Sequence, residues 1–87
     1  MAWRDVAVSR DGRFAIGVEE GSGRHYLAIP VSNRLVDYEE RYAISVEDFE
    51  RYGRDLDSAL PFVEQCRARL MDHLLLEPPG ADRGIPG

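Results

Sequence analysis

The sequence predicts an α+β fold, in which a four-stranded antiparallel meander is followed by a short helix and a longer helix packed on one sheet face. Two observations predict it. Up to residue 44, apolar and polar residues alternate between turn signals, which is typical of strands. After residue 45, the apolar residues recur at helical spacing. The 87 residues are enough for one small domain, which we expect over residues 1–76, with a flexible Pro/Gly-rich tail over 77–87.

The first turn signal sets the pairing of the first two strands. A three-residue loop over 10–12, with its glycine in the left-handed conformation, places Val8 opposite Phe14 and Val6 opposite Ile16. The second turn signal, at residues 22–23, sets the pairing of the second and third strands.

A two-residue turn at 22–23 places Ile16 opposite Ile29 and Val18 opposite Leu27. A slip of one residue in either pairing would turn every side chain of a strand to the other face. Both loops nevertheless place the apolar residues of all three strands on the same face, which indicates that this face is the core. We therefore expect the helices to cover it.

The fourth strand is expected over residues 36–44. Its core-facing positions are Val36, Tyr38, Glu40, Tyr42 and Ile44, of which only Glu40 is charged. One interpretation is a buried general acid or base flanked by two tyrosines, because desolvation raises the pKa of a carboxyl group.

The other interpretation of Glu40 is structural, and we favour it. An inward-pointing charge on an edge strand opposes sheet-to-sheet aggregation. Alternatively, the carboxylate pairs with an arginine from the helices, such as Arg51 or Arg67.

The helices follow a change of period. Ser45 is the expected N-cap, with Asp48 three residues later, and the short helix should end near Tyr52. The longer helix is expected over residues 59–73. The three consecutive leucines over 74–76 would form an apolar patch for a dimer contact if they were exposed.

The second face of the predicted sheet has a floor of small residues, namely Ala7, Ala15, Gly17 and Ala28. Such a face is either an ordinary solvated face of a half-buried sheet or a seat for a partner protein. Aromatic residues and arginine are enriched in interface anchors. The candidate binding residues are Trp3, Tyr26, Asp37, Glu39 and Arg41.

Composition excludes several chemistries. The chain contains no lysine, so a Schiff base with a lysine is impossible, and its net charge of −5 disfavours nucleic acid. The lone Cys66 is more typical of a small core residue than of a nucleophile, and His25 and His73 lack metal-ligand spacing. We expect no metal and no cofactor.

The sequence also predicts where the chain is located. It has no apolar run that could span a bilayer and no signal-peptide pattern, so we expect no membrane contact and a cytoplasmic location.

The segment YLAIPVSNRLVDYEERYAIS, with the residues that follow it to about position 67, resembles small uncharacterised bacterial proteins in which an IPVSN turn precedes a VDYEE strand. The resemblance covers residues 26–67. It implies a fold signature and a bacterial origin, and it implies no activity, cofactor or catalytic residue.

Two functions from different classes fit these features. The first is a non-catalytic protein–protein interaction module, either an immunity- or antitoxin-like inhibitor or a dimeric accessory protein, which binds another protein or a second copy of itself. The alternative is a small enzyme that uses Glu40 with Tyr38 and Tyr42 as acid–base groups, at a dimer interface. We favour the first, because so short a chain has little room for both a core and a closed pocket of about 300 Å³.

Overall fold

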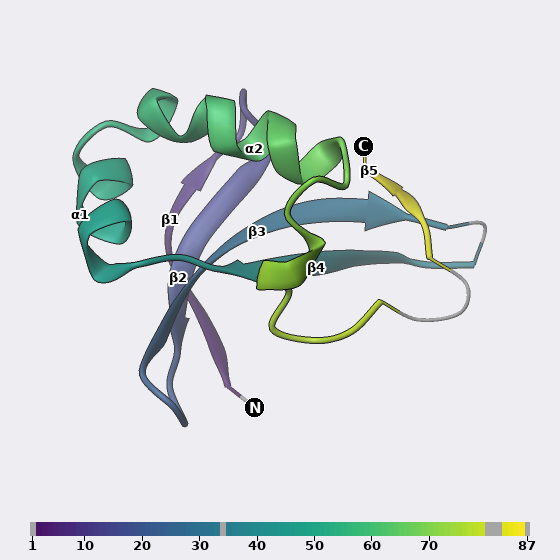
Figure 1. Cartoon of the computed structure of the whole chain (residues 1–87), viewed down its shortest axis with the longest axis horizontal. Coiled ribbons are helices and arrows are strands. Elements are labelled where there is room, and N and C mark those ends of the chain that lie inside the picture. The colour runs from purple at the N-terminus through teal and green to yellow at the C-terminus, as the bar shows by residue number, and fades with distance from the viewer. Residues whose placement is uncertain (1, 34, 80–82, 87) are drawn as a thin grey trace.

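The computed structural model describes residues 2–33, 35–79 and 83–86 and confirms the predicted α+β fold (Figure 1). Four antiparallel strands lie in sequence order across the sheet: β1 (Trp3–Ser9), β2 (Phe14–Glu19), β3 (Arg24–Ser32) and β4 (Asp37–Ala43). A fifth, two-residue strand, β5 (Ile85–Pro86), pairs with the end of β3. The sheet therefore follows the predicted meander, with one added strand.

The helices pack on one face of the sheet. They are α1 (Val46–Arg54), the 3₁₀ turn η1 (Leu56–Ala59), α2 (Leu60–Arg67) and the 3₁₀ turn η2 (Asp72–Leu74). Figure 1 shows the two α-helices along one side of the sheet, while the β3–β4 hairpin extends past them. The core between the layers contains Phe14, Ile16, Leu27, Ile29, Val31, Tyr42, Tyr52, Ala59, Val63 and Cys66.

Helix α1 begins as the capping pattern predicts. The Ser45 side chain accepts a hydrogen bond from the backbone N–H of Asp48, at 3.1 Å. The helix continues to Arg54, two residues past the predicted end at Tyr52, because Gly53 adopts a helical conformation and lies inside the last turn.

Helix α2 is shorter than predicted, and the expectation of a helix to residue 73 is wrong. Arg69 adopts the left-handed conformation, with φ of 63°. The N–H of Leu70 bonds to the carbonyl of Gln65, and the N–H of Arg69 bonds to that of Cys66, which is a Schellman motif. The helix therefore ends because residue 69 turns into the left-handed conformation, and here an arginine occupies the position that glycine usually takes.

The β1–β2 pairing differs from the prediction through a β-bulge. Trp3–Asp5 keep the predicted register, with Asp5 opposite Gly17, but the register shifts before Ala7, which lies opposite Ile16. Val6 is the extra residue. Ala7 therefore packs against the core, contrary to the prediction, whereas Val8 is turned away and 58% exposed.

The β2–β3 pairing is shifted by two residues from the prediction, since Ile16 lies opposite Leu27 instead of Ile29. A shift of two residues leaves every side chain on its predicted face. In β4, Tyr38, Glu40 and Tyr42 also lie on the core side. Val36 was expected there, but it precedes the strand and is 58% exposed.

Part of the last strand's outer edge is covered by the three consecutive leucines. Leu75 forms a bridge with Tyr42, and the backbone N–H of Leu76 donates to the carbonyl of Arg41 at 2.9 Å. Leu74 and Leu75 pack against the core. These leucines thus complete the fold, and no leucine of the three is among the exposed large apolar residues of the described chain.

The tail makes contacts that its composition does not predict. Ile85 and Pro86 lie opposite Ser32 and Val31 of β3. The flexibility expected for residues 77–87 stays a prediction. Within the residues that the structure describes, no helix is long and apolar enough to cross a membrane.

Candidate functional site

Glu40 is a buried carboxylate at the centre of an ion-pair cluster. Only 5% of the surface of Glu40 is exposed to solvent. The Arg69 guanidinium donates to its Oε1 at 2.6 Å, and Arg83 donates to Oε2 at 2.8 Å and to Oε1 at 3.1 Å. The Tyr42 hydroxyl also donates to Oε1, at 3.1 Å. Arg83 continues the cluster to Asp72 of η2, at 2.7 and 2.9 Å.

This environment fixes the charge of Glu40. Desolvation alone would raise the pKa of its carboxyl, but the hydrogen bond from Arg83 and the charges of Arg69 and Arg83 lower it overall. Burial, followed by the nearby Glu40 charge, raises the pKa of Tyr42. Glu40 is therefore ionised and Tyr42 protonated at neutral pH, and the main acceptor sites of the carboxylate are already used.

The interpretation of Glu40 as an ion-pair residue fits this geometry, but the arginines suggested as partners are wrong. Arg51 pairs with Asp48 within α1, and Arg67 pairs with Glu64 and donates to the carbonyl of Gly12. Both expected partners are on helices, whereas both actual partners lie in segments without helical spacing.

Tyr38, the other tyrosine beside Glu40, contacts the C-terminal segment. Its hydroxyl accepts a hydrogen bond from the backbone N–H of Gly84, at 2.8 Å. The two tyrosines beside Glu40 thus have different partners, one on the carboxylate and one on the tail.

On the second face of the sheet, three of the candidate binding residues form one stack. The Trp3 and Tyr26 rings meet edge-to-face, with centroids 5.4 Å apart. The guanidinium carbon of Arg41 lies 4.5 Å from the Trp3 ring centroid and 5.9 Å from that of Tyr26. Tyr26 is fully buried, and its hydroxyl donates to Asp5 at 2.6 Å.

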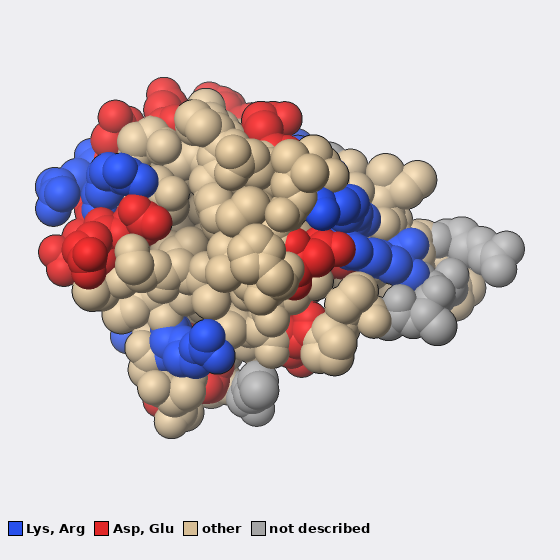
Figure 2. Space-filling view, viewed as in Figure 1, with Lys and Arg blue, Asp and Glu red and all other residues tan. Residues whose placement is uncertain are grey.

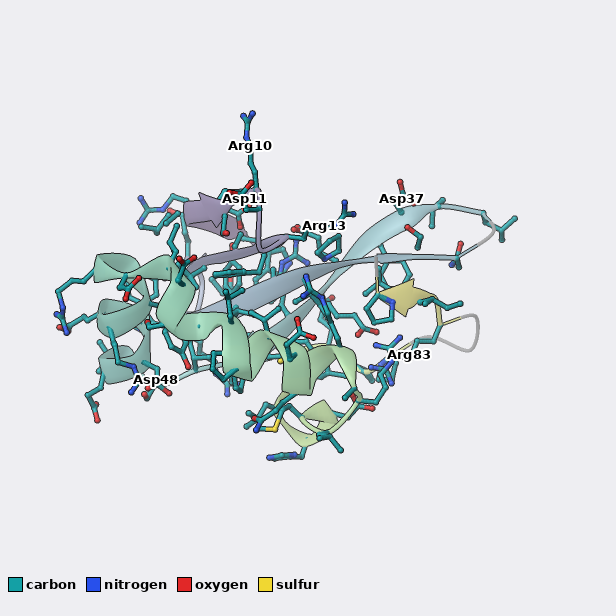
Figure 3. All side chains as sticks on the ribbon, turned by 90° about the horizontal axis from the view of Figure 1, so that it is seen from above. Arg10, Asp11, Arg13, Asp37, Asp48 and Arg83 are labelled. Atoms are coloured by element: carbon teal, nitrogen blue, oxygen red, sulfur yellow. The ribbon has the colours of Figure 1, made fainter. Side chains whose placement is uncertain are left out.

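The two acidic candidates are separated along β4. Glu39 accepts a hydrogen bond from Arg41, at 3.1 Å, and so joins the stack. Asp37 accepts from the Ser32 hydroxyl at 2.7 Å, and Figure 3 shows it on the extended β3–β4 hairpin. The structure therefore brings four of the five candidates together, at one place on the second face.

A groove that the sequence does not predict lies beside this stack. It has a volume of about 290 Å³ and is lined by Asp5, Val8, Ser9, Arg10, Arg13, Phe14, Ala15, Pro30 and Glu39. Val8 and Pro30 supply apolar walls, carboxylates come from β1 and β4, and arginines come from the β1–β2 turn. Figure 3 shows Arg10 projecting from that turn, away from the helices. The bulge at Val6 turns Val8 to this face, where its side chain lines the groove.

Cys66 is a core residue. It is fully buried, and burial, followed by the charges of Asp72 and Glu40, raises the pKa of its thiol to about 12. In the described ranges, no three His, Cys, Asp or Glu side chains lie close enough to hold a metal ion.

Comparisons with models of known protein families, with curated proteins and with solved structures found no match. The similarity of residues 26–67 to small bacterial proteins therefore stays a prediction. What the chain does has to be inferred from its own surfaces.

Proposed function

We propose that this chain is a non-catalytic protein–protein interaction module that binds a basic partner protein through the second face of its sheet. The observation that carries the proposal is the groove beside the Trp3–Tyr26–Arg41 stack. Its volume of about 290 Å³ is at the lower end for a small-molecule pocket, but it suffices for one or two side chains of a partner.

The walls of the groove suit a protein surface. Val8 is 58% exposed, so an apolar wall already faces solvent. Asp5 accepts a hydrogen bond from Tyr26 and Glu39 accepts one from Arg41, and a carboxylate can accept more than one such bond, including one from a partner's arginine or lysine. Tyr26 and Arg41 hold the Trp3 ring in place, and Trp3 supplies an aromatic contact at the edge.

Net charge favours a basic partner. The chain carries −5, and Figure 2 shows acidic side chains spread along the helical edge. A negative field accelerates the approach of a positively charged protein and makes its association rate fall with salt. An immunity- or antitoxin-like inhibitor of a basic protein in the cytoplasm has these properties.

The enzyme alternative has less support. A carboxylate that is held by two guanidinium groups and a hydroxyl is a weak proton acceptor, and a lowered pKa makes it a poor acid at neutral pH. The pKa of Glu40 is therefore shifted away from neutral pH, whereas a general acid or base needs a pKa near it.

A matched pair of valine substitutions tests the proposal. Val8 and Val36 are both 58% exposed, but only Val8 lines the groove. Tagged wild-type, Val8→Arg and Val36→Arg chains are used to capture partners, and the retained protein is purified and titrated at several salt concentrations.

We expect a basic protein that binds wild type and Val36→Arg alike, and that binds Val8→Arg at least about tenfold more weakly. Equal binding by all three chains would rule out this face. Light scattering on the free chains distinguishes self-association, since a wild-type dimer abolished by Val8→Arg would make a second copy the partner instead.

A further inference from the structure

On the helix-covered side of the sheet, Glu40 and Asp72 bind the guanidinium group of Arg83, which belongs to the chain's own C-terminal segment. The guanidinium is held on two edges at once. Nε and Nη2 donate to the two oxygens of Glu40, at 2.8 and 3.1 Å, and Nη1 and Nη2 donate to the two oxygens of Asp72, at 2.7 and 2.9 Å. Double bidentate contact of this kind recognises the planar fork of arginine and cannot be reproduced by a lysine ammonium.

The groups that hold Arg83 are positioned by the rest of the fold. Glu40 belongs to β4 and is fixed by Tyr42 and by Arg69. Asp72 belongs to η2, which follows the left-handed turn at Arg69. The two carboxylates therefore face the same point from separate elements, and Arg69 supplies a cation for Glu40 that does not depend on the tail.

The backbone after Arg83 is also recognised. The N–H of Gly84 donates to the Tyr38 hydroxyl, and its carbonyl accepts from Arg69. A Cβ atom at Gly84 would overlap the backbone of Ser32, so only glycine fits here.

An added strand fits beside this point because β3 is longer than its neighbour. The described pairs between β2 and β3 stop at Ala28, and β5 pairs with β3 at Val31 and Ser32. Ile85 itself is 77% exposed, so the docking depends on the arginine, the glycine and the backbone.

We propose that this place is a peptide-binding site for an extended Arg-Gly segment of a partner protein, which the chain's own residues 83–86 fill until such a segment displaces them. Figure 3 shows Arg83 beside the end of α2 and β5, where the tail reaches the sheet. The binding mode is strand addition with one specificity pocket, in which main-chain hydrogen bonds supply affinity and the arginine supplies selectivity.

A full-length chain with the tail displaced provides the test. Gly84→Ala places a methyl group against Ser32, so the tail should leave its site while Glu40, Asp72 and Tyr38 stay in place. Gly53→Ala is the matched control, because the nearest atom to its added Cβ is a side-chain carbon of Ile16 at 3.9 Å. The probe is an acetylated peptide with the sequence of residues 82–87, followed by NMR titration and by the thermal midpoint.

We expect the peptide to bind Gly84→Ala at least about tenfold more tightly than wild type or Gly53→Ala, because an attached tail competes at an effective concentration in the millimolar range. Binding should shift the resonances of Tyr38 and Ser32 and raise the thermal midpoint. Peptides with lysine for the arginine, or alanine for the glycine, should bind at least about tenfold more weakly.

Arg83→Gln is a second variant, in case the tail of Gly84→Ala stays docked. This substitution removes the guanidinium group that Glu40 and Asp72 hold. The bound peptide supplies its own guanidinium group in that place and should recover the thermal stability that the substitution costs. No binding to either variant, or equal binding of the lysine peptide, would overturn the proposal and leave Arg83 as a purely structural ion pair. Since Val8 lines a groove on the opposite face, Val8→Arg should not change peptide binding, which separates this site from the proposed function.

Discussion

Arg83 and Glu40 lie 43 residues apart in the sequence, and two hydrogen bonds join their side chains. The contact links the C-terminal segment to the middle of β4. The ion pairs from Arg83 and Arg69 offset the desolvation cost of the buried Glu40 charge, so removing one partner should destabilise the fold.

Glu40→Gln is expected to destabilise the chain by about 1.5–3 kcal/mol at pH 7, because it leaves hydrogen bonds to a charged acceptor unmade. The folded-state pKa of Glu40 is lowered from 4.5, so its contribution is fully present above pH 4.5 and is lost as the pH falls through the folded-state pKa. Urea unfolding of wild type and Glu40→Gln, at pH 7 and in acid, measures the difference in their free energies of unfolding. That difference should be smaller in acid.

The control for Glu40→Gln is Glu64→Gln, which removes an exposed carboxylate paired with Arg67. A surface pair of this kind contributes about 0–1 kcal/mol, so its loss should change stability little. A Glu40→Gln chain as stable as wild type at pH 7 would contradict the compensation of the buried charge.

Glu19 should titrate with a pKa of about 2, well below the ordinary value of 4.5. The carboxylate accepts hydrogen bonds from the backbone N–H groups of Gly21, Ser22 and Ala2, at 2.9, 2.8 and 3.0 Å. The bond from Gly21 is the largest cause of the lowered pKa, followed by the side chain of Ser22 and by Ala2.

The consequence for stability follows from the sign of that shift. Because the folded-state pKa of Glu19 is the lower one, its contribution is complete above pH 4.5 and is lost between pH 4.5 and about 2. Carboxyl-carbon NMR through this range measures the titration directly. A midpoint near 4.5 would mean that the three hydrogen bonds do not hold in solution.

Alternation predicted the faces of the sheet better than it predicted the register. The β2–β3 pairing is off by two residues, which preserves every face, because the turn contains four residues where the sequence suggested two. The bulge at Val6 has no local signal, since valine is an ordinary strand residue. It results from how β1 pairs with β2, and that pairing depends on tertiary packing.

The candidate sites were predictable only in part. Glu40 is visible in the sequence as the one charge among the core-facing positions of its strand, but its partners follow 29 and 43 residues later in segments without periodicity. A buried carboxylate requires a cation, and that rule does not say which of eleven arginines supplies it. Alternation placed Trp3, Tyr26 and Arg41 on one face, but it did not predict that their side chains stack.

Gly17→Ala should destabilise the fold by about 1–3 kcal/mol. An added Cβ would overlap the carbonyl oxygen of Arg4 and the ring of Tyr26, so the stack on the second face and the β1 backbone would both have to move. Gly53→Ala has room for its methyl group and should stabilise the chain by about 0.5–1 kcal/mol, because alanine favours the helix. Thermal unfolding should therefore give shifts of opposite sign, and two equal shifts would contradict the close approach at Gly17.

At Arg69, glycine should be better tolerated than alanine. Both substitutions remove the ion pair with Glu40, so the difference between them isolates the backbone. With φ of 63°, a residue with a Cβ is strained by about 1–2 kcal/mol, which predicts that Arg69→Gly is more stable than Arg69→Ala by about 1 kcal/mol. Arg67 is the last residue of α2 and still helical, so the order should reverse there, with alanine more stable than glycine by about 0.5–1 kcal/mol. Chemical unfolding of the four variants measures both differences, and the same sign at both positions would show that the left-handed turn at Arg69 does not end the helix.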